Sequence, residues 1–203
     1  MSDGFKPTLD IVFISVSQDR KAICEILQEA DISIYCDSTN DEFINEETEK
    51  GTAAILLLDI NKEYFEIYFE EYPEKNYRDV AKSIAQKAKE KFATPAFLIA
   101  GSHLETDAEA LLFGFEDVIG KQVNVFGGMA GDDYSFTEQF VFTNGKSKDC
   151  ALAALIIDED KIDVRGIATC GWKAVGTTKT VTKSEGNMVY TIDAKPALDM
   201  LKN

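Results

Sequence analysis

Histidine and tryptophan are the scarcest residues in this chain of 203 residues, since each occurs once, as His103 and Trp172. Hydrolysis by a Ser–His or Cys–His pair needs an available imidazole. His103 directly follows Ser102, and adjacent side chains rarely point the same way. The nucleophile pattern G-x-S-x-G is absent as well. The sequence therefore argues against nucleophilic hydrolysis.

Basic residues are also few compared with acidic ones. The chain has 21 Lys and Arg against 36 Asp and Glu, which gives a formal net charge of −15 at pH 7. Such a charge repels nucleic-acid phosphates and anionic lipid surfaces, so we expect neither nucleic acid nor a membrane as a partner. No apolar run approaches the length of a membrane-spanning helix, and the first residues lack the basic start and apolar core of a signal peptide.

Cysteine occurs four times, and no two cysteines form a C-x-x-C pair of the kind found in zinc and redox sites. Cys24, Cys36 and Cys150 lie in apolar surroundings, which is typical of buried free thiols in a reducing compartment. We therefore expect a cytoplasmic protein.

Apolar periodicity predicts an α/β fold with one mixed, extended sheet, whose N-terminal half is rich in βα units and whose C-terminal half is rich in antiparallel strands. Strand 9–16, helix 18–30 and strand 31–36 form a βαβ unit, so the first two strands should be parallel. The remaining expected helices cover 77–92 and 107–119 and begin at 196, and the remaining expected strands cover 52–60, 63–72, 96–100, 123–126, 136–142, 149–157, 162–169, 177–183 and 187–192.

Two polar loops that follow expected buried strands are the best candidates for a binding site. One is the acidic and hydroxyl-rich loop 37–42, and the other is the loop 127–133, which holds three glycines and a pair of acids. Ligands of open α/β sheets bind in loops after strand ends, and glycine allows positive φ or close approach. The alternative is that both loops are plain connections. The candidate ligand-binding residues are Cys36, Asp37, Ser38, Thr39, Asn40, Asp41, Gly127, Gly128, Met129, Asp132, Asp133, Gly171 and Trp172.

The acids in these loops also allow a metal-dependent function. Carboxylate oxygens are the ligands that Mg²⁺ and Ca²⁺ prefer, although no known metal signature is present. If the protein is an enzyme and not a binding protein, we therefore expect a metal-assisted hydrolase. The acids that could together hold the ion are Asp37, Asp41, Glu42, Asp132 and Asp133.

Two further features allow other functions. His103 is the one imidazole that could bind haem iron, although a lone histidine at a strand end is more often structural. A stripe of Tyr and Glu within 64–72 could bind a protein partner, but such a stripe is more often the outer face of an amphipathic strand.

Several segments occur in an order and spacing that are specific when taken together. They are 126–133, 140–145, 151–155, 171–176, 181–187 and 196–199. With these segments the chain resembles the N-terminal part of the FIST sensory domain family, from about residue 10 to the end. The expected organisation is a tail over 1–9 followed by a ligand-sensing domain over 10–203.

The resemblance implies an intracellular sensor that binds a small molecule such as an amino acid, without a cofactor and without catalysis. It also implies a signalling output, such as a histidine kinase, a chemoreceptor or a cyclic-dinucleotide enzyme. Some members of the family are associated with haem and nitric oxide sensing, so a haem-based gas sensor that uses His103 is the alternative.

The chain departs from the family pattern in two places. Cys36 and Ser38 match the segment after the second strand, whereas Asn40 replaces a glycine and Asp41 takes the position of the acid. Asn tolerates the left-handed conformation, so we expect the turn to persist with a changed ligand preference. The chain also ends where the C-terminal half of the family would begin. A site shared between the halves would then need a separate chain or a homodimer partner.

The resulting hypothesis is that segments 37–41, 127–133 and 171–172 line one pocket. In it the acids bind the amino group of the ligand, Ser38 and the backbone N–H groups near Gly127 and Gly128 bind its carboxylate, and Trp172 forms a wall.

Overall fold

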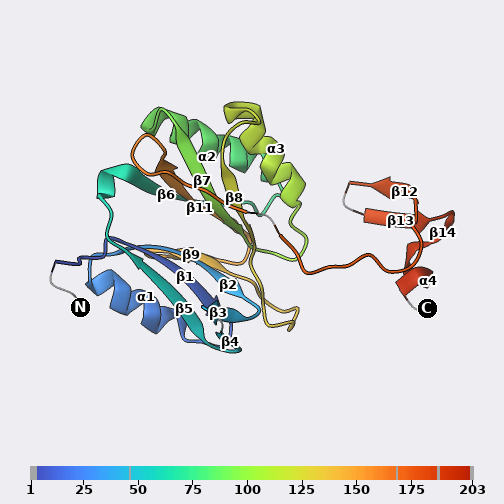
Figure 1. The fold of residues 1–203 in the computed structure, drawn as a ribbon, viewed down its shortest axis with the longest axis horizontal. Helices are drawn as coiled ribbons and strands as arrows, with labels where there is room; N and C mark the ends of the chain where they lie inside the picture. The colour runs from blue at the N-terminus through green and yellow to red at the C-terminus, as the bar shows by residue number, and fades with distance from the viewer. Residues whose placement is uncertain (1–3, 46, 168, 187, 202–203) are drawn as a thin grey trace. The chain divides into compact units, whose positions relative to one another are not determined.

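The computed structural model describes residues 4–45, 47–167, 169–186 and 188–201, and the chain divides into two compact units, residues 1–166 and 167–203. The elements of the first unit are β1 (Leu9–Ser15), α1 (Arg20–Glu29), β2 (Ser33–Thr39), β3 (Glu42–Ile44), β4 (Glu47–Glu49), β5 (Ala53–Leu58), the short 3₁₀ helix η1 (Lys62–Tyr64), β6 (Phe65–Glu71), α2 (Tyr77–Lys91), β7 (Pro95–Gly101), α3 (Ala108–Ile119), β8 (Val125–Met129), β9 (Val141–Thr143), β10 (Lys146–Lys148) and β11 (Ala151–Asp158) (Figure 1). Those of the second unit are β12 (Val181–Glu185), β13 (Met188–Ile192), β14 (Lys195–Pro196) and α4 (Ala197–Leu201).

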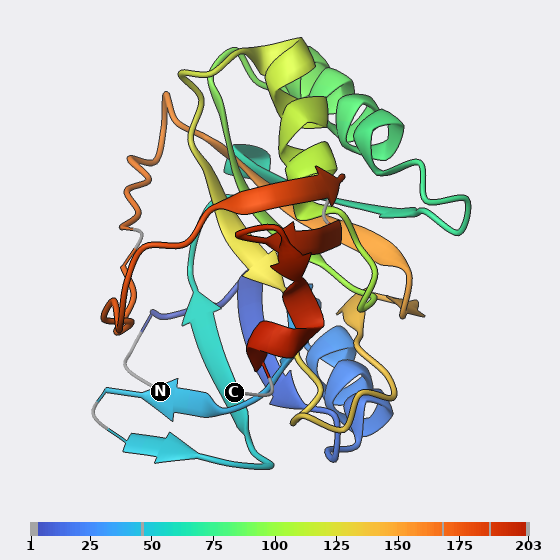
Figure 2. The same cartoon turned by 90° about the vertical axis from the view of Figure 1, so that its right-hand side faces the viewer.

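Two sheets pack face to face in the first unit, and helices cover their outer faces (Figures 1 and 2). The first sheet has the strand order β10-β9-β2-β1-β5, and the second has the order β6-β11-β7-β8. Helix α1 packs on the first sheet, whereas α2 and α3 pack on the second. The predicted α/β fold class is confirmed. None of the described helices is long and apolar enough to cross a membrane.

Strand β1 shows why this sequence forms layers. Leu9 and Ile11 contribute to the core between the two sheets, while Val12 and Ile14 contribute to the core beneath α1. Side chains of a strand alternate between its two faces, so a nearly continuous apolar run supplies two cores at once. The prediction that the first two strands are parallel is confirmed by the β1–β2 pairing.

The expectation of one extended sheet is wrong, because the strands of the first unit form separate sheets. Strand β11 also lacks the hairpin partner that was expected after it. β11 pairs antiparallel with β6 along one side and with β7 along the other. A strand with two neighbours has no free edge, so the segment after it cannot return as its hairpin partner. The expected strand 162–169 is accordingly absent at residues 162–167 and 169, and residue 168 lies outside the described residues.

The expected strand 136–142 is also mostly wrong, because only Val141–Thr143 forms β9. The residues before it belong to a loop in which Phe136 has a positive φ of 53°. An L-residue with positive φ does not continue a strand.

Glycine is required at position 127. Its φ is +136°, and a Cβ there would lie 1.8 Å from Ile99 O. The neighbouring Gly128 has no positive φ, and a Cβ on it would meet no atom within 4 Å. The two glycines of this pair therefore have different roles.

We predict that Gly127→Ala destabilises the fold by about 3 kcal/mol or more, because the backbone strain and the steric overlap add together. Gly128→Ala is the matched control and should change the free energy of unfolding by less than about 1 kcal/mol. Urea unfolding followed by far-UV circular dichroism measures both. Equal effects of the two substitutions would contradict the assigned role of Gly127.

Candidate functional site

Residues 127–133, called here the crossing segment, take the chain from one sheet of the first unit to the other. Ala130 N donates to Gly101 O at the end of β7 (2.8 Å), and the next amide, Gly131 N, donates to Ser38 O of β2 (2.6 Å). The two predicted loops therefore lie against each other. They meet at the carboxyl ends of the parallel pairs β1–β2 and β7–β8.

Asn40 fastens the crossing segment to the end of β2. Its Oδ1 accepts hydrogen bonds from the backbone N–H groups of Asp132 (2.9 Å) and Asp133 (3.1 Å). Gly131 permits this approach, because a Cβ there would lie 2.6 Å from Asn40 Oδ1. Asn40 is not one of the described residues with positive φ, so its amide oxygen, and not the expected left-handed backbone, explains its place here.

Ser38 has a structural role instead of the predicted contact with a ligand carboxylate. Its hydroxyl donates to Gly131 O (2.6 Å) and accepts from Phe140 N (2.9 Å), and the residue is fully buried. A serine hydroxyl has one hydrogen to donate, and this one is used within the fold.

The carboxylates of the paired acids Asp132 and Asp133 each accept a hydrogen bond from a neighbouring residue. Asp132 is buried and its Oδ2 accepts a backbone N–H from the following loop. Asp133 Oδ2 accepts from the Ser15 hydroxyl, while Asp133 Oδ1 has no hydrogen-bond partner. Asp133 and Tyr134 have positive φ values of 54° and 60°. Such conformations cost of order 1–3 kcal/mol each and are typical of functional loops.

Asp37 is the acid of the predicted site with the fewest contacts. It is 8% exposed, its Oδ1 has no hydrogen-bond partner, and burial raises its pKa to about 7. On the same face of the sheet its neighbours are Phe13 of β1 and Val141 of β9. Cys36 points to the opposite face, into the core beneath α1, where burial raises the pKa of its thiol well above the usual range.

Glu42 and Asp41, the remaining acids of the proposed metal site, bind different partners within the protein. Glu42 is buried and accepts from the Thr39 hydroxyl (2.6 Å) and from the N–H and hydroxyl of Thr52 (both 3.1 Å). Asp41 forms an ion pair with Lys50 at 3.8 Å. Within the described part of the chain, no three His, Cys, Asp or Glu side chains are grouped so that they could hold a metal ion. The described residues therefore contain no ligand cluster for the metal ion that a metal-assisted hydrolase would need.

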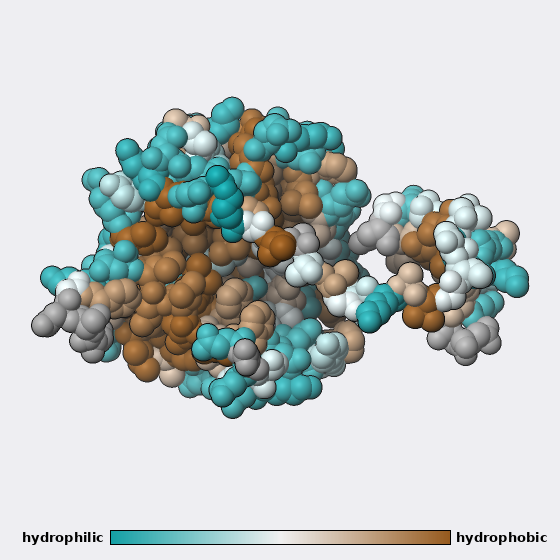
Figure 3. All heavy atoms as spheres, viewed as in Figure 1, coloured by the Kyte–Doolittle hydropathy of each residue, from teal (hydrophilic) through white to brown (hydrophobic). Residues whose placement is uncertain are grey.

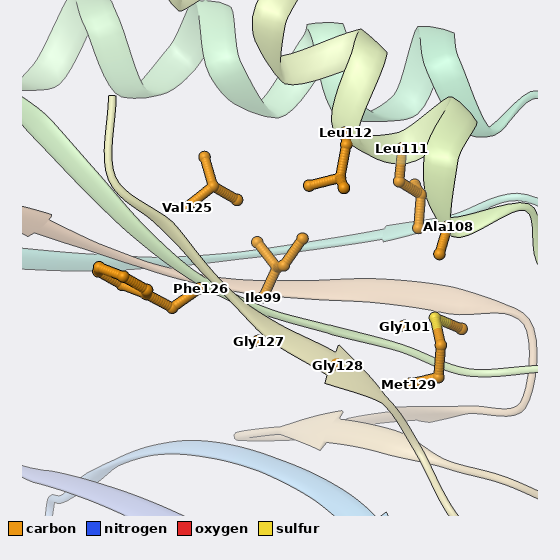
Figure 4. A pocket seen from close by; sticks show the side chains of 10 residues that line it. All are labelled: Ile99, Gly101, Ala108, Leu111, Leu112, Val125, Phe126, Gly127, Gly128 and Met129. Carbon is orange, nitrogen blue, oxygen red and sulfur yellow. The ribbon is translucent and has the colours of Figure 1, made fainter. Parts of the chain in front are cut away.

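An apolar cavity of about 200 Å³ lies between β8 and α3 (Figure 4). Ile99, Leu112 and Val125 point into it, and the predicted site residues Gly127, Gly128 and Met129 line it from β8. The other lining residues are Gly101, Ala108, Leu111 and Phe126. The cavity runs along the whole of β8, from its first residue Val125 to its last residue Met129, and reaches the carboxyl end of β7 at Gly101.

The backbone of β8 supplies polar groups beside this apolar cavity. β8 is the last strand of its sheet, and its flanking residues Asn124 and Ala130 hydrogen bond to β7. Alternate residues of a parallel strand bond to the same neighbour. The N–H and C=O groups of Val125, Gly127 and Met129 therefore point away from β7, towards the open edge.

Among models of protein families, the FIST N domain matches residues 8–195, nearly the whole chain. The chain belongs to the FIST domain family. The FIST domain is a sensory domain of signalling proteins, and a small ligand is its expected input.

The curated relative "Uncharacterized protein MJ1623" of Methanocaldococcus jannaschii is similar to part of this FIST domain. The two are 36% identical over 84 residues, which are 40% of this chain and 16% of the relative. The match thus spans about a sixth of the length of that protein. No solved structure matches this FIST domain.

Gly171 and Trp172 belong to the second unit, residues 167–203. The prediction that Trp172 forms a wall of the ligand site stays a prediction.

The surroundings of His103 do not fit a haem group. His103 Nδ1 accepts a hydrogen bond from Glu105 N (3.2 Å), and the hollow beside the ring is lined by Glu105, Glu138 and Asp149. Haem needs apolar walls, and its propionates would be repelled by three carboxylates.

The C-terminal part of the Tyr and Glu stripe of β6, residues 68–72, is covered by α2 and the core beneath it, so this part is not a free surface for a partner. Tyr72 is fully buried and its hydroxyl donates to Ser102 O (2.6 Å), and Tyr68 packs against the core under α2. Glu70 accepts from Ser83 of α2 and forms an ion pair with Lys87.

Sequence reasoning missed the α3 wall of the cavity, formed by Ala108, Leu111 and Leu112. A signal was available, because the pattern strand, helix, strand over 96–126 predicts that the helix packs on its two flanking strands. The contacts of Ser15 and Asn40 with the crossing segment had no such signal.

We predict that Asp37→Asn weakens the pH dependence of stability. A carboxyl with a pKa of about 7 when folded and near 3.8 when unfolded holds its proton longer in the folded state. The folded state then binds more protons between these two values, so stability falls as pH rises, by up to about 4 kcal/mol. Asp37→Asn removes this loss.

Urea unfolding between about pH 4 and pH 8 measures the slope. Some slope should remain in Asp37→Asn, because burial also raises the pKa of Asp10, to about 6. Asp149→Asn, at an exposed position, is the control and should keep the wild-type slope. An unchanged slope in Asp37→Asn would show that this carboxyl does not titrate as the structure indicates.

Proposed function

We propose that this FIST domain senses a small amino-acid-like molecule that binds in the cavity between β8 and α3. The observation that supports this most directly is the cavity itself, which has apolar walls and the open edge of β8 beside it. Ligand sites commonly combine mostly apolar walls with a few polar groups that fix orientation. The cavity is below the roughly 300–1,000 Å³ of sites for drug-sized ligands, which favours a molecule of amino-acid size.

In this proposal the apolar part of the ligand lies against Leu111, Leu112 and Val125, and its charged groups bind the outward N–H and C=O groups of Gly127 and Met129. This differs from the assignment expected from the sequence. None of the candidate acids lines this cavity, so the amino group of the ligand is assigned to backbone carbonyl groups instead.

The connection between the cavity and the rest of the unit suggests how binding is transmitted. The residues that line the cavity from β8 continue directly into Ala130 and Gly131, which hydrogen bond to the ends of β7 and β2. A ligand that orders β8 therefore also orders the contact between the two sheets. The proposed output is a cytoplasmic signalling protein, such as a histidine kinase, a chemoreceptor or a cyclic-dinucleotide enzyme.

We predict that one or more apolar amino acids raise the melting temperature of the purified chain. A ligand at about 100 times its dissociation constant stabilises the folded state by about 2.7 kcal/mol. The screen should cover all amino acids, small organic acids, divalent metals and haem. A shift with haem alone would contradict an amino-acid sensor, and so would the absence of a shift with every compound.

Ala108→Leu locates the site, because Ala108 lines the cavity and the larger side chain fills part of it. We expect this variant to lose the ligand-induced shift while it keeps its fold. Ala22→Leu, at an exposed position of α1, is the matched control and should retain the shift. A shift that persists in Ala108→Leu would place the ligand elsewhere.

A further inference from the structure

Arg20, the first residue of α1, carries a charge that has no partner among the described residues. Its guanidinium forms neither a hydrogen bond nor an ion pair with any of them, and its Nη1 is buried. The chain has two other arginines. Arg78 forms an ion pair with Asp117 at 2.7 Å, and Arg165 forms one with Asp163 at 2.8 Å. In a chain with 36 acidic residues, an arginine without a carboxylate indicates a group that is available to an external anion.

The ring of Phe140 holds this guanidinium in place. Arg20 Cζ lies 3.3 Å from the ring centroid, within the range in which a cation is attracted to an aromatic face. Phe140 is itself fixed to β2, because its N–H donates to Ser38 Oγ (2.9 Å) and its carbonyl accepts from Ser38 N (2.9 Å). Burial lowers the pKa of Arg20, and Glu138 opposes this shift without forming an ion pair. The charge is therefore positioned and partly removed from water.

Arg20 lines a groove of about 370 Å³ between α1 and the hairpin of β9 and β10. This volume is within the roughly 300–1,000 Å³ of typical small-molecule sites. Figure 3 shows apolar side chains gathered over β1 and β5, whereas β10 is at the opposite edge of the same sheet. The side chains that matter for binding are Arg20, Lys21, Glu25 and Gln28 from α1 and Phe142 and Ser147 from the hairpin.

The register of the hairpin shows which of its side chains face the groove. Ser147 lies opposite Phe142, which packs in the core beneath α1, so the Ser147 hydroxyl is on the α1 face. Lys146 lies opposite Thr143 on the other face, and its ammonium is 5.8 Å from the ring of Phe69 in the second sheet. The hairpin therefore contributes a hydroxyl group to the groove and not the Lys146 charge.

The remaining charges select the kind of anion. Lys21 and Glu25 form an ion pair at 3.7 Å along α1, so they compensate each other. Arg20 then leaves the groove with one uncompensated positive charge. A single carboxylate matches this charge, whereas a phosphate dianion would bring excess negative charge close to Glu25 and Glu138.

We propose that the groove binds a small organic monocarboxylate. Its carboxylate pairs with the Arg20 guanidinium, whose planar fork matches a carboxylate with two parallel hydrogen bonds. A hydroxyl or carbonyl group of the ligand reaches the Ser147 hydroxyl. This site is additional to the cavity between β8 and α3, because the two lie on the outer faces of different sheets and the described residues that line them differ.

NMR of the ¹⁵N-labelled full chain during a titration with lactate tests the site. The Nε–H signal of Arg20 and the backbone N–H signals of Gly145 and Ser147 should shift and saturate. Lactamide, in which an uncharged amide replaces the carboxylate, should bind about 10-fold more weakly or less well still, because it forms no charge-assisted pair.

Variants assign the affinity to the groove. Arg20→Gln should weaken lactate binding about 10-fold or more, and Arg20→Lys, which keeps the charge but loses the fork, should weaken it about three-fold. Ser147→Leu narrows the groove from the hairpin and should also weaken binding, independently of any effect of Arg20 on α1. Arg165→Gln is the matched control, since it removes the same charge at an exposed position outside the groove, and it should keep the wild-type affinity.

Ala108→Leu separates this site from the cavity between β8 and α3, and lactate should bind this variant as it binds the wild type. Melting temperatures without lactate show that each variant is folded. Four results would overturn the proposal: shifts confined to residues outside the groove, equal binding of lactate and lactamide, tighter binding of inorganic phosphate than of lactate, or unchanged lactate affinity in Arg20→Gln and Ser147→Leu.

Discussion

Two consecutive backbone N–H groups link the two sheets of the first unit through hydrogen bonds. Ala130 N bonds to the end of β7 and Gly131 N bonds to β2. Successive amides of an extended chain point in opposite directions, so a single strand can bond to a different sheet on each side. Gly131 is required at this point because Asn40 approaches its backbone closely. The position of every candidate site residue near the crossing segment depends on this junction.

The junction also separates two environments that the sequence places next to each other. On the β8 side the crossing segment borders an apolar cavity, and on the β2 side it borders acids and amides that mostly bond within the protein. Asn40, Asp132 and Asp133 therefore hold the loop through hydrogen bonds, whereas the cavity offers space for a ligand. This separation is why the present proposal gives the acids and the glycines different functions.

The sequence predicted the elements with strong local signals. The βαβ unit at the start, the helices over α2 and α3 and the apolar strand β11 follow from periodicity and are present. It could not predict that β6 and β7 both pair with β11, because such pairing depends on packing between segments distant in the chain. The same holds at the site. The proximity of loops 37–42 and 127–133 follows from the rule for strand ends, but the engagement of Ser38 and the α3 wall of the cavity depend on tertiary contacts.

The position of the single tryptophan has an optical consequence. Trp172 lies within residues 167–203, the second unit. The first unit, with its two sheets and the cavity, contains tyrosines but no tryptophan. Indole fluorescence therefore follows the smaller unit, and the larger unit is spectroscopically free to receive one engineered tryptophan as a reporter of its own conformation.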